Sequence, residues 1–393
     1  MNIAGIVAEY NPFHKGHAYQ IQKIREIYGE DCGIICVMSG DFVQRGEPAM
    51  FSKYARAEAA VRCGADLVLE LPVHCSVASA ERFAQGAVQI LGRLGVVDFL
   101  VFGSESGEVD TLIETAQLLS GAAFDHKVKQ CLETGCSYPA ARSMALQELL
   151  NGRDVTVNPN DNLGVEYIRA TQKFGYSMEP VAIRRIGAMH DTVSEGNIKS
   201  GSEIRSIVGS GLDYEAYIPS AAYAVYEKEM PIFSEQLDTA ILSRLRMLRQ
   251  SDFAMLPDAV EGLENRLSTA CRTETSLQAI YDSVKSKRYT HARIRRMVMC
   301  AALGITKQDY TEDNLYARVL ALNEQGGKIL RMSDGRRRID VISKPAAARE
   351  LGVAQRRMFE KTALSHDLYV LGYNETELRR GEADWVTSPV FVR

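Results

Sequence analysis

The sequence predicts an α/β fold in which a Rossmann-like parallel sheet is followed by a mainly helical domain. Up to about residue 105, continuous apolar runs alternate with amphipathic helical patterns, which is typical of a parallel sheet covered by helices on both faces. Beyond residue 219 the pattern is almost entirely helical. A chain of 393 residues is long enough for two domains. We therefore expect a nucleotide-binding domain over residues 1–212 and a helical domain over residues 213–393.

Five strands are expected in the first domain. They are predicted at Ile3–Ala8, Gly33–Met38, Asp66–Leu71, Asp98–Phe102 and Glu179–Ile186, with helices at His17–Tyr28, Lys53–Cys63, Ala80–Leu94, Thr111–Leu119, His126–Cys131 and Ala140–Leu150. Open sheets of this kind bind ligands at the carboxyl ends of their strands. The functional residues should therefore directly follow the strands.

The second domain is expected to consist of helices. They are predicted at Ser234–Arg249, Leu256–Thr269, Ser276–Ser286, Thr290–Ala302, Glu312–Leu322, Lys344–Leu351 and Ala354–Leu364, and the segments Asp367–Tyr373 and Trp385–Val392 are predicted as short strands or irregular structure.

Composition limits the classes of protein to consider. The net charge of −4 argues against a simple basic nucleic-acid binder, although charge can be uneven along a chain. The eight cysteines include no C-x-x-C pair, so we expect free thiols in a reducing compartment. No apolar run approaches the roughly 20 residues that span a bilayer, and no signal-type segment begins the chain. These features predict a cytoplasmic protein that is not held in a membrane.

The loop after the first strand contains two histidines. His14 and His17 bracket Lys15-Gly16, directly after the turn at Asn11-Pro12 and where a helical pattern begins. A helix N-terminus attracts phosphate, Gly16 allows a ligand to approach the backbone, and two imidazoles can hold one phosphate group. The arrangement predicts a nucleotide site of the nucleotidyltransferase type. The alternative is that both histidines merely satisfy hydrogen bonds of the turn and the helix start.

Loops after later strands add further candidates. Ser39, Gly40 and Arg45 follow the second strand and either face a phosphate or second substrate or form a solvated connection. Gly103 ends the fourth strand, where it either lets a base or ribose lie on the backbone or makes a simple turn. His74 follows the third strand, but a single histidine is not enough to predict a functional role.

The end of the first domain contains three more candidates. Asn160 lies at a helix start, where it either caps the helix or reads an adenine edge or a ribose. Arg184 and Arg185 alternate along the fifth strand, so at most one of them should reach a ligand. Ser202 and Arg205 lie at another helix start and form either a second anion site or an ordinary cap with a solvated arginine.

Two basic clusters lie in the second domain. The first contains Lys285, Lys287, Arg288, Arg293, Arg295 and Arg296, with Tyr289 and His291 interleaved, and the second contains Arg336, Arg337 and Arg338. Basic side chains neutralise phosphates, and aromatic rings stack on unpaired bases. The clusters therefore predict RNA contacts, with solvated helix faces as the alternative.

Taken together, these motifs closely resemble those of the tRNA(Met) cytidine acetate ligases within the H-x-G-H nucleotidyltransferase superfamily. The motifs that carry the resemblance are Gly5–His17, Met38–Pro48, Phe102–Gly107, Pro159-Asn160, Ser200–Arg205 and Lys287–Arg296. The resemblance implies that ATP and acetate form acetyl-adenylate with release of pyrophosphate. It further implies that the acetyl group passes to N4 of the wobble cytidine of elongator tRNA(Met).

The resemblance also implies site residues. His14 and His17 are implied to be catalytic. The implied ATP-binding residues are Val7, Ala8, Glu9, Tyr10, Asn11, Pro12, Phe13, His14, Lys15, Gly16, His17, Ala18, Tyr19, Gln20, Gly103, Asn160 and Arg185. Arg45, Ser202 and Arg205 are candidate phosphate contacts, and the two basic clusters are candidate tRNA contacts. A Mg²⁺ ion bridging the phosphates is expected; the sequence has no carboxylate cage, and Asp41 is a candidate ligand.

The chemistry of the first step agrees with these residues. Attack by acetate on the α-phosphate builds negative charge on the non-bridging oxygens, which preorganised donors stabilise. One alternative is an adenylyl- or cytidylyltransferase that makes a small nucleotide cofactor, and another is an RNA-binding protein regulated by nucleotide. The long helical second domain argues against the former, and the intact His14 and His17 argue against the latter.

Overall fold

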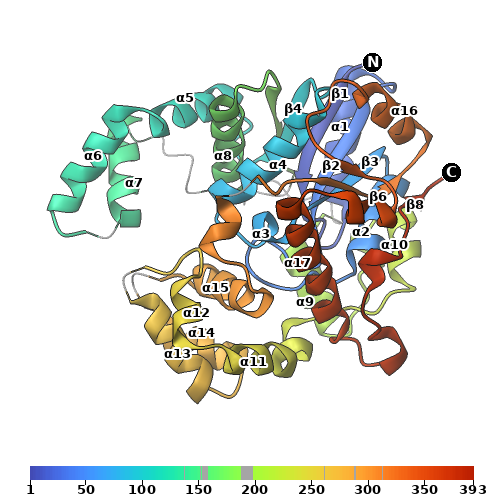
Figure 1. The fold of residues 1–393 in the computed structure, drawn as a ribbon. Helices are drawn as coiled ribbons and strands as arrows, with labels where there is room; N and C mark the ends of the chain where they lie inside the picture. Colours follow the sequence, from blue (N-terminus) through green and yellow to red (C-terminus); the bar gives the residue numbers. More distant parts are fainter. Residues whose placement is uncertain are drawn as a thin grey trace.

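An eight-stranded, mostly parallel sheet organises the protein (Figure 1). The computed structural model describes residues 1–136, 138–150, 152, 158–186, 198–260, 262–286, 289–311 and 313–393. The strands are β1 (Ile3–Ala8), β2 (Gly33–Ser39), β3 (Leu67–Leu71), β4 (Phe99–Ser104), β5 (Glu179–Arg184), β6 (Ala317–Leu322), β7 (Val341–Ile342) and β8 (Val390–Phe391). Their order is β5-β4-β1-β2-β3-β6-β7, with β8 beside β6.

The first five strands form the predicted parallel core. β1 pairs with β2 on one side and with β4 on the other, and every pairing among β1 to β5 is parallel. All seven residues of β2 are buried, as expected for a strand with helices on both faces. The strand order reverses between β1 and β4, and this switch point is where such sheets bind ligands. The predicted α/β fold class is confirmed.

Helices cover the two faces of the sheet. Apolar side chains of α1 (Lys15–Tyr28), α2 (Lys53–Arg62), α9 (Gly201–Gly209) and α10 (Ser220–Tyr226) share one core cluster with the strands. The second cluster, on the other face, includes α4 (Ala80–Leu94), α5 (Val109–Leu119), α8 (Pro159–Phe174) and α16 (Glu324–Ser333). The helices α6 (Ala122–Glu133) and α7 (Tyr138–Leu149) extend away from the sheet in Figure 1.

The remaining helices form a third core cluster beside the sheet. They are α11 (Asp238–Met247), α12 (Gln250–Ala254), α13 (Leu263–Thr273), α14 (Leu277–Val284), α15 (His291–Leu303) and α17 (Val353–Val370). The short α3 (Val73–Ser76) contributes Val73 to this cluster. Among the described residues, no helix combines the length and the apolar character required to cross a bilayer.

Two predictions for the C-terminal part are wrong. The expected helix at Glu312–Leu322 is instead strand β6, which pairs antiparallel with β3. A short apolar run does not distinguish a buried strand from a helix by periodicity, and the free edge of β3 decides the outcome. The segment Asp367–Tyr373, expected as a strand or irregular, begins within the last turn of α17.

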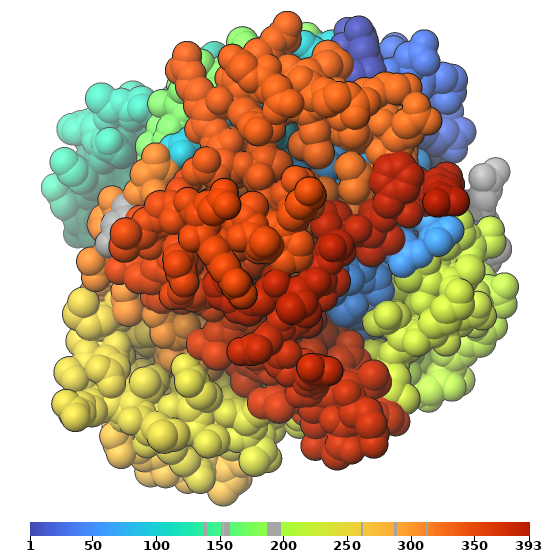
Figure 2. All heavy atoms as spheres, turned by 45° about the vertical axis from the view of Figure 1, so that its right-hand side comes forward, coloured from blue at the N-terminus to red at the C-terminus, as the bar shows by residue number. Residues whose placement is uncertain are grey.

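The three last strands return to the sheet of the first domain. Figure 2 shows the C-terminal segment in red against much earlier parts of the chain in blue and yellow-green. A buried ion pair of 2.6 Å between Lys53 and Asp384 fixes this return. The domain boundary at residue 212 stays a prediction, but the sheet itself is completed by residues from beyond it.

Candidate active site

His14 and His17 lie together at the N-terminus of α1. His14 is the N-cap residue, and its Nδ1 accepts a hydrogen bond of 3.0 Å from the backbone N–H of Gly16. The Nδ1 atom of His17 accepts one of 3.2 Å from the backbone N–H of His14. The two rings stack with centroids 3.8 Å apart. The two histidines thus form a reciprocal capping box, the role usually taken by a hydroxyl and a carboxylate.

The protonation state of both histidines follows from their surroundings. Burial lowers the pKa of His14 to about 3, assisted by the positive charges of Arg185 and Arg205. Burial, His14 and Arg185 hold the pKa of His17 well below its usual range. Both imidazoles are therefore neutral at physiological pH. Because each Nδ1 accepts a backbone hydrogen bond, the proton lies on Nε2, and each Nε2–H is available as a hydrogen-bond donor.

The two interpretations of the histidines are therefore compatible. Nδ1 of His14 satisfies a hydrogen bond of the helix start, as the structural interpretation predicts. The same hydrogen bond orients Nε2 toward the position of a ligand.

The loop before the histidines is held from three sides. Oδ1 of Asn11 accepts a hydrogen bond of 2.8 Å from the backbone N–H of Met50. The backbone carbonyl of Asn11 accepts one of 2.7 Å from Nη1 of Arg205. The backbone N–H of Phe13 donates to the hydroxyl of Tyr226 over 3.0 Å. The Asn11–Pro12 peptide bond is cis. Arg205, predicted as a phosphate contact, is thus anchored beside the histidine loop.

A buried arginine joins this loop to the loop after β2. The guanidinium of Arg56 donates to the carbonyl oxygens of Glu9 (2.5 Å), Ser39 (3.1 Å), Phe51 (2.9 Å) and Gly40. Its side chain is fully buried, and no carboxylate of the described residues forms an ion pair with it. Arg56 was not among the predicted site residues, because its only signal was an arginine among the alanines of an otherwise amphipathic helix.

The loop after β2 reaches from the histidines to α15. Ser39 is buried, whereas Arg45 is exposed at the loop. Gly46 has a positive φ of 76°, and a Cβ there would lie 2.7 Å from the backbone of Arg295. Glu47 forms an ion pair with the same arginine. The loop therefore connects the loop that carries the histidines with the first basic cluster.

Gly103, Asn160 and Arg185 meet on the other side of the switch point. Arg185 donates to Oδ1 of Asn160 over 3.4 Å, and its side chain lies 3.4 Å from where a Cβ on Gly103 would be. Glu105 accepts from the side-chain amide of Asn160 over 2.5 Å. Arg184 is exposed on the opposite face, as the alternation along the strand predicts. The structure thus brings the three residues together.

Asp161, which was not among the predicted site residues, fixes this second half of the site. The carboxylate is fully buried and accepts hydrogen bonds from the Ser104 hydroxyl and from the backbone of Glu105 (3.1 Å) and Ser106 (3.2 Å). Glu105 in turn accepts from the backbone of Asp161 over 2.9 Å at the start of α8. This reciprocal pair locks the end of β4 to the start of α8.

The start of α9 agrees with the capping alternative for its hydroxyl residues. Ser200 and Glu203 form a capping box, and Ser202 is exposed with its hydroxyl 3.1 Å from that of Ser200. Gly201 allows the helix start to approach the histidine loop, because a Cβ would lie 3.0 Å from the carbonyl oxygen of Asn11. Arg205, one turn further along α9, donates to the same carbonyl oxygen.

The structure argues against Asp41 as a magnesium ligand. Its Oδ1 accepts from the backbone of Lys53 over 3.0 Å, and its Oδ2 lies 2.9 Å from Nδ1 of His366 and 3.6 Å from Nζ of Lys53. The side chain is fully buried. Within the described ranges, no group of three or more metal-ligating side chains occurs.

The two basic clusters lie at different edges of the sheet. In the first, Arg295 pairs with Glu47, and Arg296 lies 3.7 Å from Asp258. Arg293 donates to a backbone carbonyl and Lys285 is exposed, whereas Lys287 and Arg288 lie outside the described residues. In the second, the backbone N–H of Arg338 donates to the backbone carbonyl of Arg93, in the last turn of α4, over 2.7 Å. The last turn of α4 precedes β4, so Arg336, Arg337 and Arg338 lie at the amino edge, opposite the histidines.

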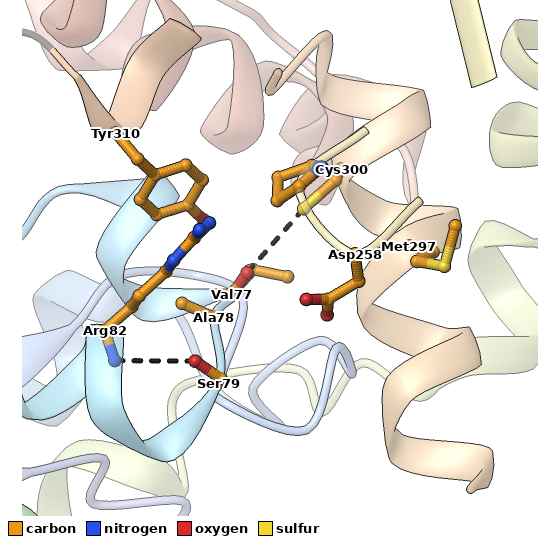
Figure 3. Close-up of a pocket in the computed structure, with 9 residues that line it drawn as sticks. Val77, Ala78, Ser79, Arg82, Asp258, Met297, Cys300 and Tyr310 are labelled. Atoms are coloured by element: carbon orange, nitrogen blue, oxygen red, sulfur yellow. Dashed lines mark hydrogen bonds between the residues drawn. The ribbon is translucent and has the colours of Figure 1, made fainter. Parts of the chain in front are cut away.

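A small pocket lies between the start of α4 and α15 (Figure 3). The guanidinium of Arg82 stacks on the ring of Tyr310 at 4.1 Å, and Cys300 donates to the carbonyl of Val77 over 3.7 Å. The lining residues are Val77, Ala78, Ser79, Arg82, Pro257, Asp258, Met297, Cys300 and Tyr310. None of them belongs to the candidate site, so the pocket marks the joint between the sheet and the helical part.

Comparisons with known proteins match nearly all of the chain. A family model described as HIGH Nucleotidyl Transferase matches residues 1–384. The tRNA(Met) cytidine acetate ligase of Acetivibrio thermocellus is 33% identical over 416 residues, which cover 100% of both chains. The protein of the same name from Thermoanaerobacter sp. is 35% identical, and the match covers 96% of this chain and 97% of that one. A crystal structure of Thermotoga maritima TmcAL bound with alpha-thio ATP has a TM-score of 0.92 at 31% identity, covering 100% of this chain and 99% of that one.

Proposed function

Because the chain belongs to the HIGH nucleotidyl transferase family, and within it to the tRNA(Met) cytidine acetate ligases, we propose that it acetylates tRNA in two steps. ATP and acetate first form acetyl-adenylate and pyrophosphate. The acetyl group then passes to N4 of the wobble cytidine of elongator tRNA(Met), and AMP leaves. This reaction takes place in the cytoplasm, where the tRNA is found.

The observation that carries the first step is the pair of neutral histidines. Each presents an Nε2–H beside the N-terminus of α1, while Nδ1 is held by the backbone. These donors stabilise the charge that develops on the α-phosphate as acetate attacks. They need no proton transfer, because acetate is already anionic. Arg205 is anchored to the same loop and adds a fixed positive charge.

The remaining ATP contacts follow the switch point of the sheet. The triphosphate lies along residues 7–20, and the nucleoside lies against Gly103, Asn160 and Arg185, which converge from β4, α8 and β5. The alpha-thio ATP bound to the Thermotoga relative supports ATP as the ligand. Mg²⁺ enters with the ATP phosphates as part of the substrate. Arg45 and Ser202 are exposed near this region and remain candidate phosphate contacts.

The first basic cluster is the proposed tRNA surface near the site. Its helix α15 contacts the loop after β2 through Gly46 and Glu47. Anticodon phosphates bound along α15 would therefore lie next to the loop that borders the adenylate. The second cluster, Arg336 to Arg338, is retained as a more distant contact for the body of the tRNA, since it lies at the opposite edge of the sheet.

Acetate-dependent exchange between ATP and pyrophosphate tests the first step. His17→Ala removes one neutral donor and should abolish exchange, whereas the exposed His126 on α6 provides the control variant His126→Ala. Labelled acetate with ATP should introduce label into elongator tRNA(Met). If the wild-type enzyme labels no tRNA, or if His17→Ala exchanges normally, the proposed function is wrong.

A further inference from the structure

Glu9 lies between the histidines and the loop that contacts α15. Its carboxylate accepts a hydrogen bond of 2.7 Å from the backbone N–H of Gln44, and its carbonyl is held by Arg56. Arg205 interacts electrostatically with both Glu9 and His14. Glu9 thus contacts the loop after β2 through Gln44, and that loop in turn contacts α15 through Gly46 and Glu47. Glu9 is placed on the side from which the tRNA is proposed to arrive.

Other carboxylates around the site are already engaged. Both oxygens of Glu105 accept hydrogen bonds at the start of α8, and those of Glu203 are held by Ser200 and Lys199. Asp161 accepts several hydrogen bonds, and Glu47 pairs with Arg295. Oε1 of Glu9 binds Gln44, whereas Oε2 has no hydrogen bond from the described residues. Glu9 thus has an oxygen available to accept a proton.

The second step of the reaction produces a proton that needs an acceptor. The exocyclic N4 of cytidine attacks the acetyl carbonyl, the new C–N bond forms, and the C–O bond to the phosphate breaks. AMP departs with the electron pair of that bond, and N4 loses one of its two protons. The first step releases no proton from acetate, so a base near the site serves the transfer step alone.

We propose that the Glu9 carboxylate is the general base that takes this proton from N4 and passes it to water. The inference rests on the proposed function and assigns the base for its second step. It explains why a carboxylate is present in a site otherwise built to bind a polyanion. A merely structural acceptor for Gln44 would not require a negative charge, because an amide oxygen would make the same hydrogen bond.

The surroundings of Glu9 suit this role. Burial raises the pKa of Glu9, and the hydrogen bond from Gln44 and the nearby arginines counteract the increase. A carboxylate with a raised pKa is a stronger base while it remains ionised near neutral pH. The groups that face Glu9 are Arg205 from α9, Arg56 from α2, Arg45 from the loop after β2 and Tyr167 from α8.

The variant Glu9→Gln distinguishes a role of Glu9 as a base from a role as the hydrogen-bond acceptor of Gln44. Glutamine retains the shape and still accepts from Gln44, but it cannot take a proton. The enzyme is first mixed with ATP and acetate, elongator tRNA(Met) is then added, and acetyl transfer is followed in a single turnover across pH. Transfer in the wild type should rise with pH to a plateau. In Glu9→Gln, transfer should be about 100-fold slower and independent of pH in that range.

Hydroxylamine and a second variant make the test selective. Hydroxylamine is a strong nucleophile that traps acetyl-adenylate without help from a base, so Glu9→Gln should still produce acetohydroxamate. The matched control is Glu26→Gln, which removes an exposed carboxylate of α1 that pairs with Lys23 and should keep the pH profile of transfer. If Glu9→Gln transfers within twofold of the wild type, or retains the pH dependence, Glu9 is not the base. If hydroxamate formation falls as much as transfer, Glu9 acts in adenylate formation and the inference is equally wrong. Failure of the wild type to label tRNA would instead refute the proposed function.

Discussion

Nδ1 of His366 lies 2.9 Å from Oδ2 of Asp41, although 325 residues separate the two in sequence. The pair joins α17 to the loop after β2. It belongs to a buried network of ionisable side chains from six separate segments of the chain. The members of this network are Asp41, Lys53, Tyr54, Glu70, Arg318, His366 and Asp384. Through it, the C-terminal part holds the loop that borders the active site.

This pair predicts a pH dependence of stability. Burial opposes the charge of His366, but Asp41 outweighs it and raises the pKa of His366 above 6.5. The stabilisation is therefore complete below pH 6.5 and is lost as the pH rises through the folded-state pKa. His366→Gln should lower the free energy of unfolding by about 3 kcal/mol at pH 6, and by less at pH 9. Urea unfolding at several pH values measures this difference.

The exposed His126 supplies the control for this series. His126→Gln should leave the free energy of unfolding nearly unchanged at every pH. A loss in His366→Gln that is the same at pH 6 and pH 9 would contradict the ion pair.

Arg56 should set the geometry of the active site. Its guanidinium joins the carbonyls that end β1 and β2, and lysine has neither the planar fork nor enough donors to replace it. We expect Arg56→Lys to fold with reduced acetate-dependent exchange, at least 10-fold below the wild type by analogy with other misplaced sites. Arg62→Lys, on the exposed face of the same helix, is the control. If added guanidinium ion partly restores exchange in Arg56→Ala, Arg56 acts by positioning the ends of β1 and β2. If Arg56→Lys exchanges at the wild-type rate, this positioning role is refuted.

The neutral histidines predict the pH profile of the first step. Burial lowers the pKa of His14 to about 3 and that of His17 well below 6.5, so neither gains a proton as the pH falls from 8 to 6. The kcat/KM for ATP in exchange should therefore show no acid limb centred near pH 6.5. An acid limb at that pH that disappears in His14→Asn or His17→Asn would show that the imidazoles titrate in the active range.

The two basic clusters predict different effects of salt on tRNA binding. Arg293, Arg295 and Arg296 are proposed to neutralise phosphates close to the site. Replacing all three by glutamine should weaken binding and reduce the slope of log K against log salt by about 2, with exchange in the absence of tRNA retained. The matching variant of Arg336, Arg337 and Arg338 should change binding less. If the second triple variant weakens tRNA binding more than the first, the tRNA surface lies at the opposite edge of the sheet.

Much of the site could be predicted because its signals are local. The apolar run of β1, the turn at Asn11 and the histidines around Gly16 lie within 15 consecutive residues, and together they specify a strand, a loop and a helix start. Gly103 and Asn160 were predicted as candidates because they lie at a strand end and at a turn before a helix. The role of Arg56 was not found, because its four acceptors are backbone carbonyls that the sequence does not distinguish from any others.

The sequence by itself determined the parallel α/β core and the histidine motif, because period, turn chemistry and helix caps depend on neighbouring residues. The tertiary structure alone decided three things. Residues Ala317–Leu322 became a strand because β3 offered an unpaired edge, and Asp41 became an ion-pair partner because α17 brings His366 to it. Glu9 was placed beside Gln44 and Arg205 by contacts across distant segments. Long-range packing sets the charge and position of such groups, so a local sequence pattern does not predict them.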